Sequence, residues 1–185
     1  MQLRRGTCSL ILPAAVYGLR FIYDIRPMKQ LFIAFICCLF VNQASAQLQP
    51  QVLPNAVFYK KDGKTFSTAQ IPTTKKAFIM FFDATCDHCQ QVAKQLSKQS
   101  GRLANSNIYL VSMDEFRSID YFMTNFAKPL MTMKNVTVLQ DKHSIFIPTF
   151  KPDKYPSMYL YNTSKRLLKF SSNDKEVPKF LELMN

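Results

Sequence analysis

Short apolar runs and helical apolar stripes alternate through the middle of the chain. Residues 77–82 (AFIMFF) and 107–112 (NIYLVS) are nearly continuous apolar runs, which predict strands buried on both faces of a sheet. Apolar positions then recur at helical spacing, which predicts helices over residues 87–100 and 114–126. Gly101 is well placed to end the first helix. This alternation indicates an α/β domain with parallel strand pairing at its centre.

Hairpins are expected on both sides of this unit. Short apolar arms meet around Asp62-Gly63, a strong signal for a tight turn. Residues 157–161 and 166–170 predict a second pair of strands, whereas 144–154 contains two prolines and gives no clear pattern. The other expected elements are a short strand and a closing helix, at residues 136–139 and 175–183. The expected fold class is therefore α/β, with a mixed central sheet, helices on both faces and an N-terminal β-hairpin.

Each expected helix carries an apolar stripe. The stripe of the first consists of Cys89, Val92, Ala93 and Leu96. The stripe of the second consists of Phe116, Ile119, Tyr121, Phe122, Met123 and Phe126. Apolar side chains at this spacing normally face a core, so we expect both stripes to be buried.

The first 46 residues have a different pattern from the rest. Met28-Lys29 precedes an 11-residue apolar run, and Ala44-Ser45-Ala46 follows it. A basic start, a short apolar core and small residues before the cut are typical of a secretory signal peptide. A helix that spans a bilayer needs about 20 apolar residues, which disfavours the alternative of an uncleaved anchor.

This signal divides the sequence into three parts. We expect translation to begin at Met28 and residues 1–46 to be removed by cleavage after Ala46. Residues 47–56 are expected to form an extended leader, and residues 57–185 to form one domain. The mature chain is then expected to be periplasmic or otherwise exported.

Removal of residues 1–46 would change both the number of cysteines and the net charge of the protein. Of five cysteines, only Cys86 and Cys89 lie beyond residue 46. A disulfide between them would close a very tight loop, which restricts the unfolded chain little and argues against a structural staple. The mature part carries 19 Lys and Arg against 11 Asp and Glu, a net charge of +8, but the lysines are scattered. Without a basic cluster, nucleic acid is not an expected partner.

The Cys86-Asp87-His88-Cys89 motif lies where an apolar strand is expected to give way to a helix. The unpaired N–H groups and the dipole of a helix N-terminus favour negative charge, so they stabilise a thiolate at Cys86. Cys89 falls on the buried stripe and should stay a neutral thiol. His88, if protonated, would favour the thiolate and Asp87 would oppose it. We therefore expect Cys86 to be the nucleophile and Cys89 the resolving thiol.

These features together resemble the thioredoxin superfamily, in particular its exported TlpA-like and redoxin-like branch. The resemblance is carried by the Cys-x-x-Cys at a helix start, by Tyr155-Pro156 before a late strand, and by the "DGK" hairpin before the central strand. It implies a thioredoxin-like three-layer sandwich and a redox-active Cys86–Cys89 disulfide. It also implies a cis peptide bond at Pro156, with Tyr155 lining a substrate groove.

The activity implied by the resemblance is dithiol–disulfide exchange on the cysteines of other exported proteins. No bound cofactor or metal is expected, and the chain is expected to act as a monomer with an unidentified redox partner. Three positions depart from the family pattern: Met80 replaces a common buried acid, Thr85 replaces an aromatic residue, and Tyr155 is bulkier than usual. The direction of electron flow, reduction or DsbA-like oxidation, stays open.

Three alternatives remain at this point. Metal or copper delivery would use the two cysteines with His88 or His143, but a closed zinc site usually has four ligands and copper chaperones of this fold space their cysteines differently. A peroxiredoxin-like peroxidase would normally carry Pro-x-x-x-Thr-x-x-Cys, which is missing before Cys86. A redox-silent binding module would present exposed aromatic residues such as Tyr159 and Tyr161.

Overall fold

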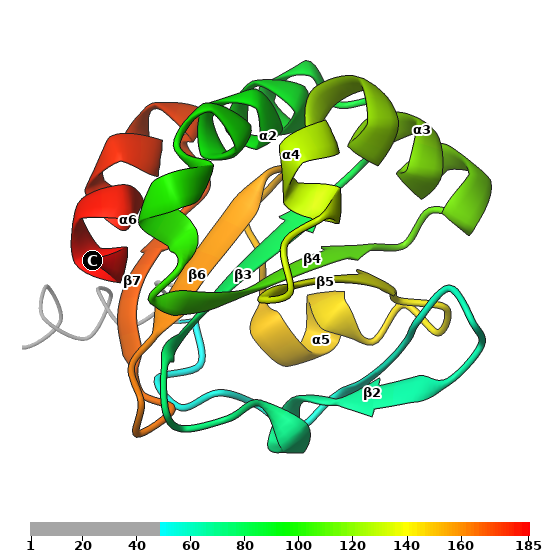
Figure 1. The fold of residues 1–185 in the computed structure, drawn as a ribbon. Helices are drawn as coiled ribbons and strands as arrows, with labels where there is room; N and C mark the ends of the chain where they lie inside the picture. The colour runs from blue at the N-terminus through cyan, green and yellow to red at the C-terminus, as the bar shows by residue number, and fades with distance from the viewer. Residues whose placement is uncertain (1–48) are drawn as a thin grey trace, which may run out of the picture. The chain divides into compact units, whose positions relative to one another are not determined.

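Seven strands form one mixed sheet at the centre of the computed structural model, which describes residues 49–185 (Figure 1). The strands are β1 Val57–Tyr59, β2 Thr65–Ser67, β3 Lys76–Phe82, β4 Ser106–Ser112, β5 Val136–Gln140, β6 Ser157–Tyr161 and β7 Leu167–Ser171. Their order across the sheet is β2-β1-β5-β4-β3-β6-β7. The signal segment expected at residues 1–46 lies outside the described residues. Within residues 49–185, no helix has the length and apolar character needed to cross a membrane.

Strand β3 occupies an interior position of the sheet, as its apolar run predicts. It pairs in parallel with β4 along its whole length and antiparallel with β6. Strand β5 pairs in parallel with β4 on the other side. Because both faces of β3 are covered, its residues from Ala77 to Phe82 are no more than 2% exposed. The mixed sheet with parallel pairing at its centre is confirmed.

Helices cover both faces of the sheet, though unequally (Figure 1). The helices are α2 Asp87–Lys98, α3 Phe116–Phe126, α4 Lys128–Met131, α5 Phe146–Phe150 and α6 Val177–Met184. Helices α2, α3, α4 and α6 lie on one face, while α5 lies on the other (Figure 1). Three short 3₁₀ helices connect elements, η1 Thr68–Gln70, η2 Ser100–Leu103 and η3 Asp174–Glu176. The expected α/β fold class is therefore confirmed.

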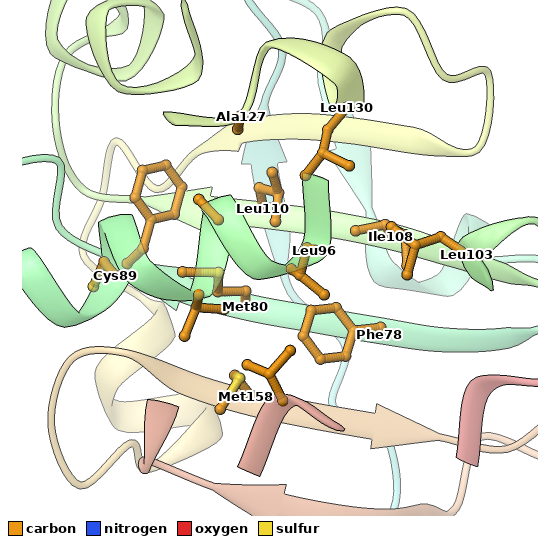
Figure 2. Close-up of a cluster of buried hydrophobic side chains, with 14 of the residues drawn as sticks. Phe78, Met80, Cys89, Leu96, Leu103, Ile108, Leu110, Ala127, Leu130 and Met158 are labelled. Carbon is orange, nitrogen blue, oxygen red and sulfur yellow. The ribbon is translucent and has the colours of Figure 1, made fainter. Parts of the chain in front are cut away.

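The core on the four-helix side is shown in Figure 2. Phe78 and Met80 of β3 point to this side and contact a cluster that includes Leu96 of α2 and Leu110 of β4. Cys89 belongs to the same cluster (Figure 2). The strand period of two sends the intervening residues of β3 to the opposite face. The buried Cys89 thus holds the first turn of α2 against the sheet.

The core on the other side is built on stacked aromatic rings. The ring of Phe146 stacks on those of Phe81 and Phe150, with centroid distances of 4.1 and 4.2 Å. The buried carboxylate of Asp141 accepts hydrogen bonds from the backbone N–H groups of Ile145 and Phe146, at 3.0 and 2.8 Å. These contacts satisfy orphan donors at the start of α5 and fix this short helix beneath β3.

Several local expectations differ from the structure. Helix α2 ends at Lys98, because Gln99 leaves the α-helical conformation (φ −110°, ψ 23°) and leads into η2. Gly101 then lies inside η2, where its φ is not left-handed, so it is not the helix stop. In contrast, Gly63 has φ +79° in the expected hairpin turn, a conformation that favours glycine. Helices α4 and α5 are additional to the expected elements.

The leader is partly paired with the sheet. Val52 forms an antiparallel bridge with Arg166, next to the start of β7. The Leu53 N–H donates to the Lys165 carbonyl at 2.8 Å, and the Leu167 N–H donates to the Gln51 carbonyl at 2.9 Å. The leader thereby covers backbone groups at the start of an edge strand that would otherwise be open to pairing.

Candidate active site

Cys86 occupies the N-cap position of α2. Its Sγ accepts a hydrogen bond from the Cys89 N–H at 3.3 Å, and its carbonyl accepts one from the Gln90 N–H at 3.0 Å. The side chain is partly exposed, and the thiol is free. A sulfur at this position receives one of the unpaired N–H donors of the helix start. The geometry therefore gives Cys86 both access and a backbone hydrogen bond to its sulfur.

Cys89 lies one helical turn further on and is fully buried. Burial raises the pKa of its thiol far above the ordinary value, and the neighbouring Cys86 acts in the same direction. A backbone hydrogen bond involving Asp83 opposes the rise but does not cancel it. As expected from the stripe on this helix, Val92, Ala93 and Leu96 are buried beside it. The two cysteines thus differ sharply in exposure and in ease of ionisation.

The loop that leads into Cys86 is held by two carboxylates. Asp83 Oδ1 accepts from the Thr85 N–H and hydroxyl at 2.7 and 2.6 Å, and the Asp83 carbonyl accepts from the Cys86 N–H at 3.3 Å. Asp114, which follows β4, accepts from the Ala84 N–H through Oδ2 at 2.8 Å. The role of Asp114 was not predicted from the sequence. Its position directly after a buried strand was the available signal, because neighbouring parallel strands end at the same edge of a sheet.

Tyr155 and Pro156 lie before β6, which runs antiparallel to β3 and so starts at the edge where Cys86 lies. The Tyr155–Pro156 peptide bond is cis. The Tyr155 ring contacts that of Phe81, with a centroid distance of 4.9 Å. Burial, and then the charge of Asp83, raise the pKa of Tyr155 to about 12. The phenol therefore stays a neutral hydrogen-bonding group throughout the physiological range.

Two hollows lie beside Tyr155. One, of about 240 Å³, is lined by Phe81, Ile147, Pro152, Asp153, Lys154 and Tyr155. The other, of about 80 Å³, is lined by His88, Lys154, Tyr155, Ser172, Asn173 and Asp174. Both hollows are lined by Lys154 and Tyr155, and the smaller one reaches His88 of the dithiol motif.

His88 and Asp87 have separate environments. The His88 Nδ1 atom lies 3.3 Å from Asp174 Oδ2, in η3. The imidazole is 71% exposed, whereas Asp174 is 21% exposed. Asp87 is an exposed residue in the first turn of α2. An acid 86 positions away in the sequence therefore provides a negative partner for the motif histidine, and no sequence pattern indicated it.

The remaining candidates lie apart from the dithiol. Met80 is fully buried in the core, so the central strand offers no acid at that position. His143 bonds to the Tyr59 hydroxyl at 2.9 Å, and within residues 49–185 no group of three or more His, Cys, Asp or Glu is placed to hold a metal ion. Tyr159 and Tyr161 are fully buried, so they do not form an exposed contact surface. Tyr121 also differs from expectation, because its side chain is 64% exposed rather than buried with its stripe.

Comparison with solved structures was made for the whole chain. A secreted disulfide oxidoreductase of Mycobacterium tuberculosis, homologous to E. coli DsbE, matches with a TM-score of 0.57 and 16% identity, over 69% of this chain and 95% of the other. A domain of a possible thiol-disulfide isomerase from Cytophaga hutchinsonii matches with a TM-score of 0.59 and 18% identity, over 75% and 94% of the two chains. Peroxidoxin BcpB from M. tuberculosis matches with a TM-score of 0.60 and 10% identity, over 74% and 94%.

No protein-family model matches the sequence, and no curated protein matches it. The structural matches establish a shared fold, which the solved oxidoreductases and the peroxidoxin have in common. Chemistry on this chain must therefore be argued from its own residues.

Proposed function

We propose that this chain, which has the thioredoxin-like fold, is an exported thiol:disulfide oxidoreductase that exchanges electrons with the cysteines of other proteins. One observation carries the proposal. A partly exposed Cys86 sulfur accepts the Cys89 N–H at a helix start, while Cys89 is buried one turn behind it. This is the asymmetry that dithiol–disulfide exchange requires, because one thiol must meet the substrate and the other must act only afterwards.

The exchange follows from that asymmetry in two steps. The Cys86 thiolate attacks one sulfur of a substrate disulfide, which forms a mixed disulfide and releases the other substrate sulfur as a thiolate. Cys89 then loses its proton and attacks Cys86 Sγ. This second attack forms the Cys86–Cys89 disulfide and releases the remaining substrate thiolate. Two electrons have then passed from this dithiol to the substrate. A dithiol partner must reduce the Cys86–Cys89 disulfide before the next cycle. The same steps in reverse oxidise a substrate dithiol.

The raised pKa of Cys89 supports this order of events. A neutral, buried Cys89 does not compete for the substrate disulfide, and it does not attack the mixed disulfide until its proton is removed. The mixed disulfide is therefore a distinct intermediate with a finite lifetime. The backbone groups of the Asp83–Thr85 loop, which are held by hydrogen bonds, keep the approach to Cys86 in one arrangement.

The test is insulin reduction with dithiothreitol as the electron donor, for the mature chain and its Cys86→Ser and Cys89→Ser variants. The mature chain should accelerate the reaction, and Cys86→Ser should reduce the rate to that of dithiothreitol alone. Equal acceleration by Cys86→Ser would show that the proposal is wrong. Hydrogen peroxide consumption, measured on the same samples, tests the peroxidase alternative, and faster turnover of peroxide than of insulin would replace the proposal.

Export is a separate part of the proposal. It rests on the signal pattern before Gln47. Expression of the full sequence, followed by cell fractionation and N-terminal sequencing, tests it. A protein in the exported fraction that begins at Gln47 supports the proposal, and a full-length chain retained in the cytoplasm contradicts it.

A further inference from the structure

A third hollow lies against the dithiol loop and shares no lining residue with the two beside Tyr155. Its volume is about 500 Å³, and it is lined by Ala84, Thr85, Gln90, Arg117, Ser118 and Tyr121. Ala84 and Thr85 come directly before Cys86, and Gln90 follows Cys89, so the lining of this hollow flanks the dithiol motif in the sequence. Helix α3 supplies its opposite wall through residues 117, 118 and 121.

Arg117 places an unpaired positive charge in this wall of the hollow. It is exposed, and its guanidinium makes no ion pair or hydrogen bond to any residue within 49–185. The nearby acid of the same helix, Asp120, is instead paired with Lys61 at 2.7 Å. A guanidinium has five donors in a planar fork that fits a carboxylate, and this one is free to bind a carboxylate from another molecule.

Tyr121 lies one helical turn after Arg117, on the same side of α3. Its side chain is 64% exposed, although the flanking Phe122 and Met123 are buried. The carbonyl of Tyr121 accepts from Asn125 Nδ2 at 2.7 Å, so the helix backbone at this point is regular and supported. Tyrosine and arginine are both among the residue types enriched at the energetic centres of protein interfaces.

We infer that this hollow, which we name the α3 face, binds the polypeptide of the substrate on one side of its cysteine and selects an acidic residue there. The inference rests on the proposed function, because the lining of the hollow flanks the dithiol motif in the sequence. Arg117 would pair with the substrate carboxylate while Tyr121 contacts the adjoining apolar part of the chain. The net charge of +8 over residues 47–185 adds a general attraction for acidic partners.

The experiment uses three short cysteine peptides, each supplied as its symmetrical disulfide. They differ only in the residues on both sides of the cysteine, which are glutamate, glutamine or lysine. The value of kcat/KM for reduction is measured with the mature chain, with Arg117→Gln and with Tyr121→Ser. The mature chain should prefer the glutamate peptide. An exposed ion pair is worth up to about 1 kcal/mol, so Arg117→Gln should lower kcat/KM for that peptide by about fivefold and leave the glutamine peptide nearly unchanged.

Two matched variants separate recognition from general effects. Arg166→Gln removes the same charge from another exposed arginine, which precedes β7 at the opposite edge of the sheet, and it should alter all three peptides equally and little. Tyr121→Ser should lower kcat/KM for all three peptides by about fivefold, whereas Tyr121→Phe should retain most of it. High salt should weaken the preference for glutamate.

The possible outcomes distinguish the two proposals. If the mature chain reduces all three peptides at the same rate, or if Arg117→Gln and Arg166→Gln have the same effect, the α3 face does not select acidic substrates and the proposed function stands. If the mature chain reduces none of the peptides and does not reduce insulin, both proposals are overturned. A preference for glutamate that disappears only with Arg117→Gln supports the inference.

Discussion

The carboxylate of Asp114 joins the end of β4 to the loop before the dithiol, because its Oδ2 atom accepts from the Ala84 N–H at 2.8 Å and from the Ser112 hydroxyl at 2.9 Å. Ala84 is buried, so its N–H has no ready replacement partner in water. The position of Cys86 therefore depends on a residue from the neighbouring strand. This connection fixes the start of α2 relative to the sheet.

Asp114→Ala should destabilise the domain by about 2 kcal/mol, because it leaves a buried N–H and a hydroxyl without their acceptor. Urea unfolding measures this change. Asp114→Asn keeps an acceptor oxygen and should cost much less, which separates the hydrogen bonds from the charge. An equal loss in both variants would show that charge, rather than the acceptor geometry, is what stabilises the loop.

Cys89→Ser should convert transient mixed disulfides into stable ones, because nothing remains to attack Cys86 from within the molecule. Incubation of this variant with an extract of exported proteins, followed by non-reducing electrophoresis, should reveal higher-mass species that reducing agent removes. The Cys86→Ser variant is the control and should trap nothing, because its remaining thiol is buried. A Cys89→Ser variant that forms no adducts in any redox buffer contradicts the resolving role.

Alkaline conditions should unfold the reduced domain progressively. Burial raises the pKa of both Tyr109 and Tyr155 to about 12, whereas an unfolded tyrosine has a pKa of about 10. Between these values the folded state binds more protons than the unfolded state, so the free energy of unfolding falls as the pH rises from about 10 to about 12. The contribution of the two tyrosines to stability is fully retained below this window. Urea unfolding at stepped pH measures the fall, which should be shallower for Tyr155→Phe.

The buried thiol of Cys89 should start this loss at lower pH. Its pKa is also raised by burial, so the reduced protein should begin to lose stability once an unfolded cysteine ionises, above about pH 8.5. The oxidised protein has no Cys89 thiol and should lack this early part of the decline. Matching curves for reduced and oxidised protein between pH 8 and 10 would contradict the prediction.

Removal of the Asp174 carboxylate should shift the reduction potential of the dithiol through His88. When its partner is lost, a protonated His88 is free to stabilise the Cys86 thiolate, which favours the reduced form and makes the potential less negative. An exposed charge pair is worth about 1 kcal/mol or less, which corresponds to about 20 mV for two electrons. Glutathione equilibration of Asp174→Asn in mildly acidic buffer measures the shift.

The matched control for this shift is the same substitution in a His88→Ala background. If Asp174 acts through the imidazole, Asp174→Asn should have no effect on the potential of the His88→Ala protein. An equal shift in both backgrounds would mean that the carboxylate acts on the dithiol directly. The double-mutant cycle therefore identifies the route of the effect.

The aromatic stack beneath β3 should contribute strongly to stability. Phe146→Ala removes a fully buried ring that contacts Phe81 and Phe150, and such a change typically costs about 3–5 kcal/mol. The neighbouring Ile147 is 46% exposed, so Ile147→Ala should cost far less and serves as the matched control. Thermal and urea unfolding measure both variants. Similar losses for the two would show that α5 is not anchored by the stack.

The central strands and helices could be predicted from the sequence because their apolar patterns are local. A two-sided apolar run such as that of β3 has few alternatives to an interior strand, and Cys89 follows the buried stripe of its helix. Helix α5 was not readable, because it is five residues long, contains a proline and is fixed by Asp141 rather than by its own periodicity. Its stability comes from tertiary contacts, which a periodic pattern does not encode.

The position of the dithiol could likewise be predicted from the sequence, whereas the residues that hold it in place could not. Spacing alone placed the two cysteines at a helix start, but Asp114 and Asp174 reach the motif from positions 28 and 86 residues away from Cys86 and His88. Tyr121 was misjudged for a related reason. Its stripe is wider than the face of α3 that meets the sheet, so a residue at the margin of the stripe remains outside.

The bridge between Val52 and Arg166 sets the direction in which the leader crosses the domain. Arg166 precedes β7, which starts level with the beginning of β3, whereas Cys86 follows the end of β3. The leader is antiparallel to β7, so the residues before Val52 lead back toward the end of the sheet that carries Cys86, where Gln49 Nε2 donates to Asp153 Oδ1 at 3.3 Å. A tag or a solid support attached before Gln49 would therefore lie close to Asp153, which lines the hollow beside Tyr155.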